Sequence, residues 1–188
     1  MNRFPTELET ERLILRALTP RDAPGLHEAV TASYPELHRW MPWAKAPYGI
    51  EEARRFCAFA RKRFEEGLDL HVLLVLAADR SIIGSAGLQT RDPDVPSFEI
   101  GYWLHTAYVG RGFVTEAARA LTRFAFDRLG GRRVELRIDA RNRRSQAVAE
   151  RLGYEWEATF GSDHRDNLGE VGDTRIYAMF SAGQLAPA

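Results

Sequence analysis

The sequence predicts a mixed α/β domain of the α+β class, with about seven strands and four helices. Segments with an apolar residue at every second position alternate with segments whose apolar residues recur every three or four positions, which indicates strands and helices in turn. The length of 188 residues suits one domain, since domains usually span about 100 to 200 residues. With 45% hydrophobic and 28% charged residues, the chain has enough apolar side chains for a sizeable core. We therefore expect residues 1–188 to form a single domain.

Apolar alternation and strand-forming residues define the expected strands. The seven strands are predicted at residues 12–18, 71–78, 81–89, 98–104, 133–139, 154–160 and 174–181. Asp79 and Arg80 join the second and third strands, a connection of hairpin length.

Helical spacing and capping residues define the expected helices. The four helices are predicted at residues 20–32, 51–66, 115–129 and 142–153. In the third, Ala117, Leu121 and Ala125 repeat at the i, i+4 spacing. In the fourth, Asn142 suits the N-cap and Gly153 the C-cap.

Charge and cysteine content limit the possible partners. Lys plus Arg and Asp plus Glu both number 26, so the formal net charge is zero. No whole-molecule field then draws the chain to nucleic acid or a membrane, and we expect neither as a partner. The lone Cys57 excludes an intramolecular disulfide and a cysteine-based zinc cage. Because the N-terminal residues also lack an apolar signal core, we expect a cytoplasmic protein.

The neutral total is predicted to hide two local charges. Residues 141–144 carry three arginines, whereas residues 162–173 carry four carboxylates against one arginine. If the acidic segment borders an acceptor cleft, the molecule has an anion seat at one end and a cation-attracting rim at the other.

The loop between residues 104 and 115 carries the strongest chemical signal. Gly110 and Gly112 stand just before the third helix, where glycine lets backbone N–H groups close around an anion at the positive helix end. This predicts a phosphate or pyrophosphate seat, although a turn that uses glycine for geometry alone has the same pattern. The Gly-Lys-Ser/Thr ending of a P-loop is absent. The third glycine of a dinucleotide fingerprint is replaced by Thr115.

Five consecutive matches give the chain a family resemblance. EIGYWL, GRGFVTEA, the helix that follows, RVELR, and N-x-x-S ahead of AERLGY are similar to the acyl-CoA-dependent N-acyltransferases of the GNAT superfamily. The opening LETERLILRAL resembles their Rim-type branch, the ribosomal-protein N-acetyltransferases. The resemblance covers nearly the whole chain in the right order. It implies a mostly antiparallel sheet whose fourth and fifth strands splay apart around the pantetheine arm of acetyl-CoA or another short acyl-CoA.

The resemblance also implies which residues hold the acyl donor. Backbone groups near Trp103 and Leu104 are expected to bond the pantetheine arm, and one amide to polarise the thioester carbonyl. The loop expected around the pyrophosphate consists of Val109, Gly110, Arg111, Gly112, Phe113, Val114 and Thr115. Val109 and Val114 depart from the family pattern, which we expect to weaken affinity.

Further cofactor contacts are expected from the fifth-strand side. Asn142 and Ser145 are implied there, and Arg111, Arg141, Arg143 and Arg144 are candidates for the phosphates. A solvated surface is the alternative for each arginine. No metal is expected.

The implied reaction is direct attack of a neutral amine on the thioester, which needs a group to accept the amine proton and a group to protonate the CoA thiolate. Ser145 is the candidate proton donor, because Ala149 stands where many family members have a tyrosine; helix capping is its alternative role. Glu99 is the first candidate base, since it shares a strand face with Gly101 and Trp103. Its alternative is a half-exposed strand residue.

His164 is the second candidate base, on a segment that we expect to be a loop and that matches the branch's acidic catalytic region. The other histidines, His27, His38, His71 and His105, have no metal-ligand spacing and are predicted to be structural or solvent-facing. Cys57 lacks activating neighbours, so an acyl-cysteine route has little support. Trp40 to Trp43 form either an aromatic wall over the acceptor cleft or a hydrophobic plug between the early helices.

The acceptor is expected to be an amine, and a protein N-terminal amine is favoured over lysine. Deprotonating lysine at neutral pH costs about 2.5 pKa units, or roughly 3.4 kcal/mol, more than deprotonating an α-amine. A small-molecule amine such as a polyamine, amino acid or aminoglycoside is the second hypothesis. A non-catalytic acyl-CoA-binding sensor is the third. The resemblance also suggests a homodimer.

Overall fold

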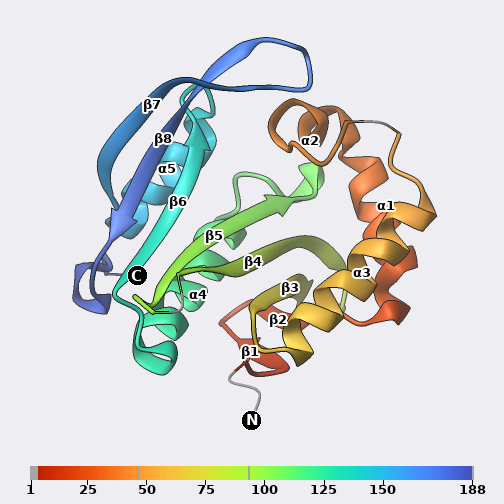
Figure 1. Cartoon of the computed structure of the whole chain (residues 1–188). Helices are drawn as coiled ribbons and strands as arrows, with labels where there is room; N and C mark the ends of the chain where they lie inside the picture. Colours follow the sequence, from red (N-terminus) through yellow and green to blue (C-terminus); the bar gives the residue numbers. More distant parts are fainter. Residues whose placement is uncertain (1–3, 46, 93, 188) are drawn as a thin grey trace.

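A single mixed sheet organises the molecule. The computed structural model describes residues 4–45, 47–92 and 94–187. Eight strands pair in the order β1-β2-β3-β4-β5-β6-β8-β7 (Figure 1). The strands are β1 (Glu7–Glu9), β2 (Leu13–Ala17), β3 (Asp69–Leu76), β4 (Ile82–Asp92), β5 (Ser97–Leu104), β6 (Arg133–Asp139), β7 (Glu155–Arg165) and β8 (Val171–Met179). All neighbours are antiparallel except β5 and β6, so the predicted fold class is confirmed.

Helices cover both faces of the sheet. The α-helices in the described residues are α1 (Ala23–Ala32), α2 (Tyr34–Trp40), α3 (Ile50–Glu65), α4 (Phe113–Leu129) and α5 (Arg143–Leu152). One core cluster joins α4 and α5 to one face of the sheet, and a second joins α1, α2 and α3 to the other (Figure 1). Across the described ranges, no helix is both long and apolar enough to span a bilayer.

Two short elements lie where the sequence predicts none. The edge strand β1 has three residues and α2 has seven, of which Leu37 alone is buried. Segments this short hold too few apolar residues to show a period. Each is stabilised by its neighbours, β1 by pairing with β2 and α2 by packing in the second core cluster.

The C-terminal region corrects the expected loop around His164. β7 extends to Arg165 and pairs with β8 through His164–Gly172 and Arg165–Val171. The strand predicted at residues 154–160 is confirmed, but its continuation to Arg165 is mostly exposed, so no alternation of apolar residues marks that part. At the tip of this hairpin, Asn167 Nδ2 donates to the carbonyls of His38 and Met41, both at 2.8 Å. The hairpin thereby reaches the end of α2.

Glycines and one asparagine set the limits of α4 and α5. α4 begins at Phe113, two residues earlier than predicted, after Gly112 at φ 83°, and ends at Gly130 at φ 66°. At α5, the predicted caps are confirmed: Asn142 Oδ1 accepts from the backbone N–H of Ser145 at 3.1 Å, and Gly153 ends the helix.

The predicted splay lies between β5 and β6. Their parallel pairing covers the register Ser97–Arg133 to Glu99–Glu135. Beyond Glu99, β5 continues to Leu104 alongside β4 while β6 turns away to pair with β8 (Figure 1). Within the described chain, the β6-facing edge of residues 100–104 has no strand partner. This edge opens a cleft between α4 and α5.

Candidate functional site

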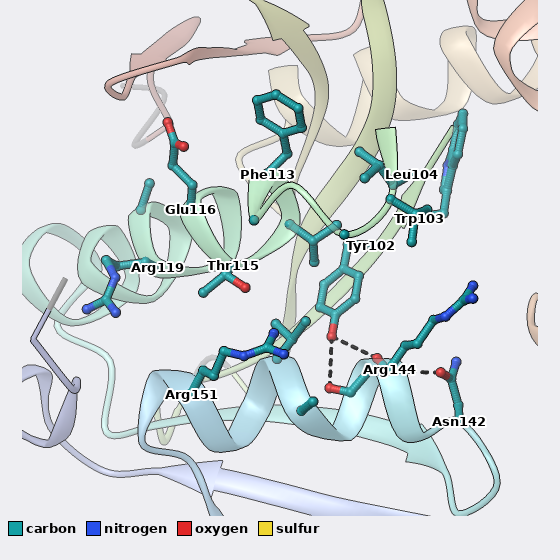
Figure 2. A pocket seen from close by; sticks show the side chains of 18 of the residues that line it. Tyr102, Trp103, Leu104, Phe113, Thr115, Glu116, Arg119, Asn142, Arg144 and Arg151 are labelled. Atoms are coloured by element: carbon teal, nitrogen blue, oxygen red, sulfur yellow. Dashed lines mark hydrogen bonds between the residues drawn. The ribbon is translucent and has the colours of Figure 1, made fainter. Parts of the chain in front are cut away.

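A large cavity of about 1100 Å³ occupies the splay. Its lining comes from the end of β5, the loop that follows, and the facing sides of α4 and α5 (Figure 2). The predicted cofactor residues belong to this lining except Arg111 and Arg141; those in it are Trp103, Leu104, Val109, Gly110, Gly112, Phe113, Val114, Thr115, Asn142, Arg143, Arg144 and Ser145. Most of the residues that the sequence predicts as cofactor ligands therefore lie around one cavity.

The glycine loop has the geometry of an anion seat. Gly110 and Gly112 have φ values of 84° and 83°, which side chains other than glycine rarely adopt. A Cβ at Gly110 would meet no atom within 4 Å, so backbone conformation and not crowding requires glycine there. The loop leads into the first turn of α4, whose free N–H groups and positive dipole end favour a phosphate.

Arginines surround the large cavity. In the described part of the chain, those that line it are Arg12, Arg119, Arg123, Arg143, Arg144 and Arg151. Arg12 also holds the loop, because it donates to the carboxylate of Glu116 at 2.7 Å and to the carbonyl of Arg111 at 2.9 Å. This concentration of cations suits a polyphosphate ligand.

Two of the predicted phosphate ligands point elsewhere. The guanidinium of Arg141 lies 2.7 Å from Asp139, 2.9 Å from Asp166 and 2.8 Å from Glu170. Arg111 stacks over the ring of Tyr108 at 5.4 Å from its centroid, outside the lining. Arg141 is therefore a structural cation.

The sequence suggests that the arginine cluster at residues 141–144 and the acidic segment at residues 162–173 lie at opposite ends of the molecule. In the structure, the acidic segment contacts the arginine cluster. Asp166 and Glu170, two of its carboxylates, bind Arg141 itself. Asp163 pairs with His164 at 3.0 Å, and Asp173 accepts from the N–H of Ser162 at 2.7 Å. Arg141 and His164 offset part of this negative charge, and neither the large cavity nor the smaller one that adjoins it is lined by a residue of 162–173, so the condition for a cation-attracting rim is not met.

Tyr102 spans the splay and was missed by sequence reasoning. Its hydroxyl lies 2.7 Å from Ser145 Oγ on α5, and burial raises the pKa of Tyr102 to about 12 (Figure 2). Ser145 is fixed by the capping bond from its N–H to Asn142. The alternation of β5 could have revealed Tyr102, because it lies on the face opposite Gly101 and Trp103. The family tyrosine position, Ala149, is fully buried in the core.

A small cavity of about 390 Å³ adjoins the large one. The two linings share Met41, Tyr102 and Trp103. The walls of the small cavity come from α1, α3 and the segment after α2, and its floor from β3, β4 and β5. A thioester carbonyl that reaches the end of the large cavity would therefore face the small one across Trp103.

The aromatic segment after α2 forms part of the small cavity's wall. Met41 and Trp43 line it, and the Trp43 ring lies 6.4 Å from Trp103 and 5.7 Å from Tyr48 between centroids. Trp40 lines the large cavity. Of the two expected roles, these positions favour the aromatic wall.

Glu99 lies beyond both cavities. Its carboxylate is 3.5 Å from the guanidinium of Arg91, and its β6 neighbour in register is Glu135. Burial raises the pKa of Glu99, while Arg91 acts against the rise. Neither cavity lining contains Glu99. Its role as a base stays a prediction that no contact supports.

His164 is held between two carboxylates. Its ring nitrogens lie 3.0 Å from Asp163 and 3.0 Å from Asp139. The bond to Asp163, together with that to Asp139, raises the pKa of His164, which favours the charged imidazolium over a free base. His164 is absent from both linings.

His71 is the histidine that reaches a cavity, contrary to the expectation that it is structural or exposed to solvent. It lies on β3, is 8% exposed and lines the small cavity. His27, His38 and His105 lie outside both linings. Among the residues described, no group of three or more His, Cys, Asp or Glu side chains is placed to hold a metal. Burial raises the pKa of Cys57 to about 11, as expected for an unreactive thiol.

Comparison with known proteins gives a consistent assignment. The family described as Acetyltransferase (GNAT) domain matches residues 12–155. The putative ribosomal N-acetyltransferase YdaF of Bacillus subtilis (strain 168) is 30% identical over 147 residues, covering 77% of this chain and 78% of YdaF. A solved probable acetyltransferase superimposes with a TM-score of 0.86 at 27% identity, over 93% of this chain and 96% of the other. RimL, a ribosomal L7/L12 alpha-N-protein acetyltransferase, superimposes with a TM-score of 0.81 at 25% identity, over 94% and 92%.

Proposed function

Because this chain belongs to the GNAT acetyltransferase family and to its Rim-type branch, we propose that it transfers an acetyl group from acetyl-CoA to the N-terminal α-amine of a protein. Membership of the family makes the chain an acetyl-CoA-dependent N-acetyltransferase; the acceptor and the roles of individual residues are the proposal. The observation that carries it is the meeting of two cavities at Trp103, one lined by arginines and the other by aromatic rings.

The large cavity is assigned to acetyl-CoA. The unpaired edge of residues 100–104 suits the amides of the pantetheine arm, which can bond there as a further strand does. Gly110, Gly112 and the first turn of α4 suit the pyrophosphate, and Arg143, Arg144 and the other lining arginines suit its remaining charges. A volume of about 1100 Å³ fits a ligand of this size.

The end of β5 is assigned to the thioester. A Cβ at Gly84 would stand 2.4 Å from the carbonyl oxygen of Trp103, so glycine is required at this contact between β4 and β5. This approach fixes the backbone at Trp103 and Leu104, where an N–H group can polarise the thioester carbonyl. Attack of the amine forms the C–N bond, and collapse of the intermediate breaks the C–S bond.

The hydroxyl pair of Tyr102 and Ser145 is assigned to the leaving sulfur. A tyrosine with a pKa of about 12 does not give its proton outright to a thiolate whose conjugate thiol has a pKa of about 8.5, because that transfer is uphill by roughly 5 kcal/mol. The pair instead donates a hydrogen bond as charge develops on sulfur, and the CoA thiolate takes up its proton on release. This refines the expected role of Ser145.

Two arguments support an α-amine as the acceptor: the names of similar proteins and the free energy needed to deprotonate the amine. YdaF is named as a ribosomal N-acetyltransferase and RimL as an alpha-N-protein acetyltransferase. An α-amine is already partly neutral at pH 7, whereas lysine costs about 3.4 kcal/mol more to deprotonate. Of the lining carboxylates, Glu116 and Glu52 accept from backbone N–H groups and pair with Arg12 and Arg55, so neither is free to offset that cost.

Thiol release from acetyl-CoA across a panel of amines tests the proposal. The panel pairs peptides that have a free α-amine and blocked lysines with peptides blocked the other way, and adds a polyamine and an aminoglycoside. The peptides with the free α-amine should give the highest kcat/KM. Turnover confined to the small amines would replace the proposed acceptor class. CoA binding without turnover of any amine would identify a sensor.

A further inference from the structure

The floor of the small cavity is a row of three residues, one from each of three strands. His71 on β3 pairs with Gly87 on β4, which pairs with Gly101 on β5. All three line the cavity. The next row on this face is Leu73, Ser85 and Trp103. His71 therefore lies two strands from β5 and one row from Trp103, at which the two cavities meet.

Gly87 and Gly101 have no side chains, so the imidazole of His71 can occupy the space above this row. A Cβ at Gly87 would stand 3.0 Å from His71 Nδ1, so the ring lies over β4 in the direction of β5. A Cβ at Gly101 would meet nothing within 4 Å, so the floor beyond Gly87 is open. A molecule in the small cavity can therefore lie between the imidazole and Trp103.

The imidazole is buried without a hydrogen-bond partner in the described chain. Its relative exposure is 8%, and the rings of Phe56 and Phe59 pack against it at 5.5 and 5.9 Å between centroids. Buried polar side chains are nearly always hydrogen-bonded. Among the described residues, Arg175 Nε is the one fully enclosed side-chain nitrogen or oxygen that lacks a partner, so the ring nitrogens of His71 are open to the small cavity, where a bound molecule can satisfy them.

The surroundings of His71 favour the neutral imidazole. Burial lowers the pKa of His71, Arg63 adds to the effect, and Asp69 opposes it. The other titratable groups that face the cavity are Tyr48 from the segment after α2, Glu52 and Arg55 from α3, and Tyr102 from β5. The Glu52 carboxylate is bound to the N–H of Gly49 and to Arg55, so it leaves the ring without a free anion to stabilise its charge.

We propose that His71 is a catalytic residue that accepts the proton of the acceptor amine in the small cavity. The proposal rests on the proposed function, because it places the amine in this cavity. The amine nitrogen forms a bond to the acetyl carbon, the bond from that carbon to the CoA sulfur breaks, and the proton lost by nitrogen moves to a ring nitrogen of His71. The imidazolium returns this proton to solvent while the released thiolate is protonated, so the products are an amide and CoA.

The pH profile of the His71→Gln variant tests this role. The assay uses two acceptors, the preferred peptide and an O-alkylhydroxylamine. The nitrogen of the O-alkylhydroxylamine stays neutral over the pH range, so any fall of its kcat/KM at low pH, the acid limb, belongs to the enzyme. Wild-type kcat/KM should fall as pH drops below the ordinary imidazole value of about 6.5. His71→Gln should lower kcat about 10²- to 10⁴-fold and abolish this limb, as expected for loss of a general base. His27→Gln, a half-buried histidine outside both linings, is the matched control.

A second pair of variants separates catalysis from folding. Gly87→Ala should shift the imidazole by a few tenths of an ångström and lower kcat on its own, yet lower it little further when His71 is already Gln. CoA affinity should remain within about twofold in each variant, since the large cavity is untouched. An NMR titration of wild type should show the His71 ring neutral at pH 7 and titrating below the ordinary imidazole range.

Failure of the role proposed for His71 can be told apart from failure of the proposed function. If wild type acetylates the peptide but His71→Gln keeps the acid limb, or raises KM alone, His71 is not the base. A ring that is charged at pH 7 would overturn the proposal without any activity measurement. If wild type binds CoA and acetylates no amine, the proposed function fails and this role fails with it.

Discussion

Tyr102 and Ser145 form a hydroxyl pair that joins the two arms of the splay at the point where the cavities meet. The 2.7 Å bond between them depends on two different elements, because Tyr102 comes from β5 and Ser145 from the first turn of α5. Since Asn142 fixes the backbone N–H of Ser145, the serine can act without adjusting its position. We assign the pair to the leaving sulfur because it lies where the two cavities meet.

Removing either hydroxyl should slow the reaction and leave cofactor binding almost unchanged. A hydrogen bond to a charged group contributes about 1.5 to 3 kcal/mol, so Tyr102→Phe and Ser145→Ala should each lower kcat roughly 10- to 150-fold. The double variant should lose little more than either single one, because both belong to one network. Steady-state kinetics and calorimetric CoA titration measure the two effects. Equal losses of kcat and CoA affinity would make the pair a cofactor ligand only.

At the scale of elements, we assign the loop before α4 and the first turn of α5 to the binding of acetyl-CoA. Gly110 and Gly112 hold left-handed backbone, which places consecutive N–H groups ahead of a helix end. α4 supplies a matched comparison, because Gly130 at its other end is also left-handed and also has open space around its Cβ position.

Gly110→Ala should therefore weaken acetyl-CoA binding, whereas Gly130→Ala should not. Each substitution places a side chain in left-handed backbone and should cost about 1 to 2 kcal/mol of folding stability. Only Gly110 lies in the cavity lining, so only its variant should show a several-fold higher Kd for CoA. Thermal unfolding and CoA titration of both variants measure this. A similar Kd in the two variants would separate the loop from the phosphates.

Elements with a strong local signal could be predicted from the sequence, and contacts between strands could not. The limits of α5 follow from Asn142 and Gly153, because capping is local chemistry. The first part of β7 was predicted as residues 154–160, whereas its extension to Arg165 lacked a signal because an exposed edge strand has no alternation. The sequence could not place His71 in the small cavity, because that position depends on the register that brings Gly87 beside it and Gly101 beyond, and register is a property of the assembled sheet.

Over the whole molecule, zero net charge reflects local pairing. Asp139 is the centre of one such group, bound by Arg141 at 2.7 Å and by His164 at 3.0 Å. Although burial acts to raise it, the bonds from Arg141 and His164 lower the pKa of Asp139 to about 2. The group connects the start of α5 to the β7–β8 hairpin, whose tip at Asn167 binds the end of α2. It thereby links the two sides of the cleft.

His164 should stabilise the fold in a pH-dependent manner. Its pKa is raised in the folded state by Asp163 and Asp139, so its stabilisation is complete below the unfolded value of about 6.5 and is lost as pH rises through the folded value. The melting temperature of wild type should exceed that of His164→Gln most at pH 6, and the difference should shrink by pH 9. A difference that does not change with pH would show that His164 stays neutral.

The predicted homodimer and cytoplasmic location stay predictions.

The most direct test of acetyl transfer to a protein α-amine is an internal competition. One peptide that carries both a free N-terminal amine and a free lysine is incubated with acetyl-CoA at pH 7, and tandem mass spectrometry locates the acetyl group in the early product. Because lysine costs about 3.4 kcal/mol more to deprotonate, the acetyl group should lie on the α-nitrogen in nearly all of the product. Acetylation mainly on the lysine side chain would contradict the assignment.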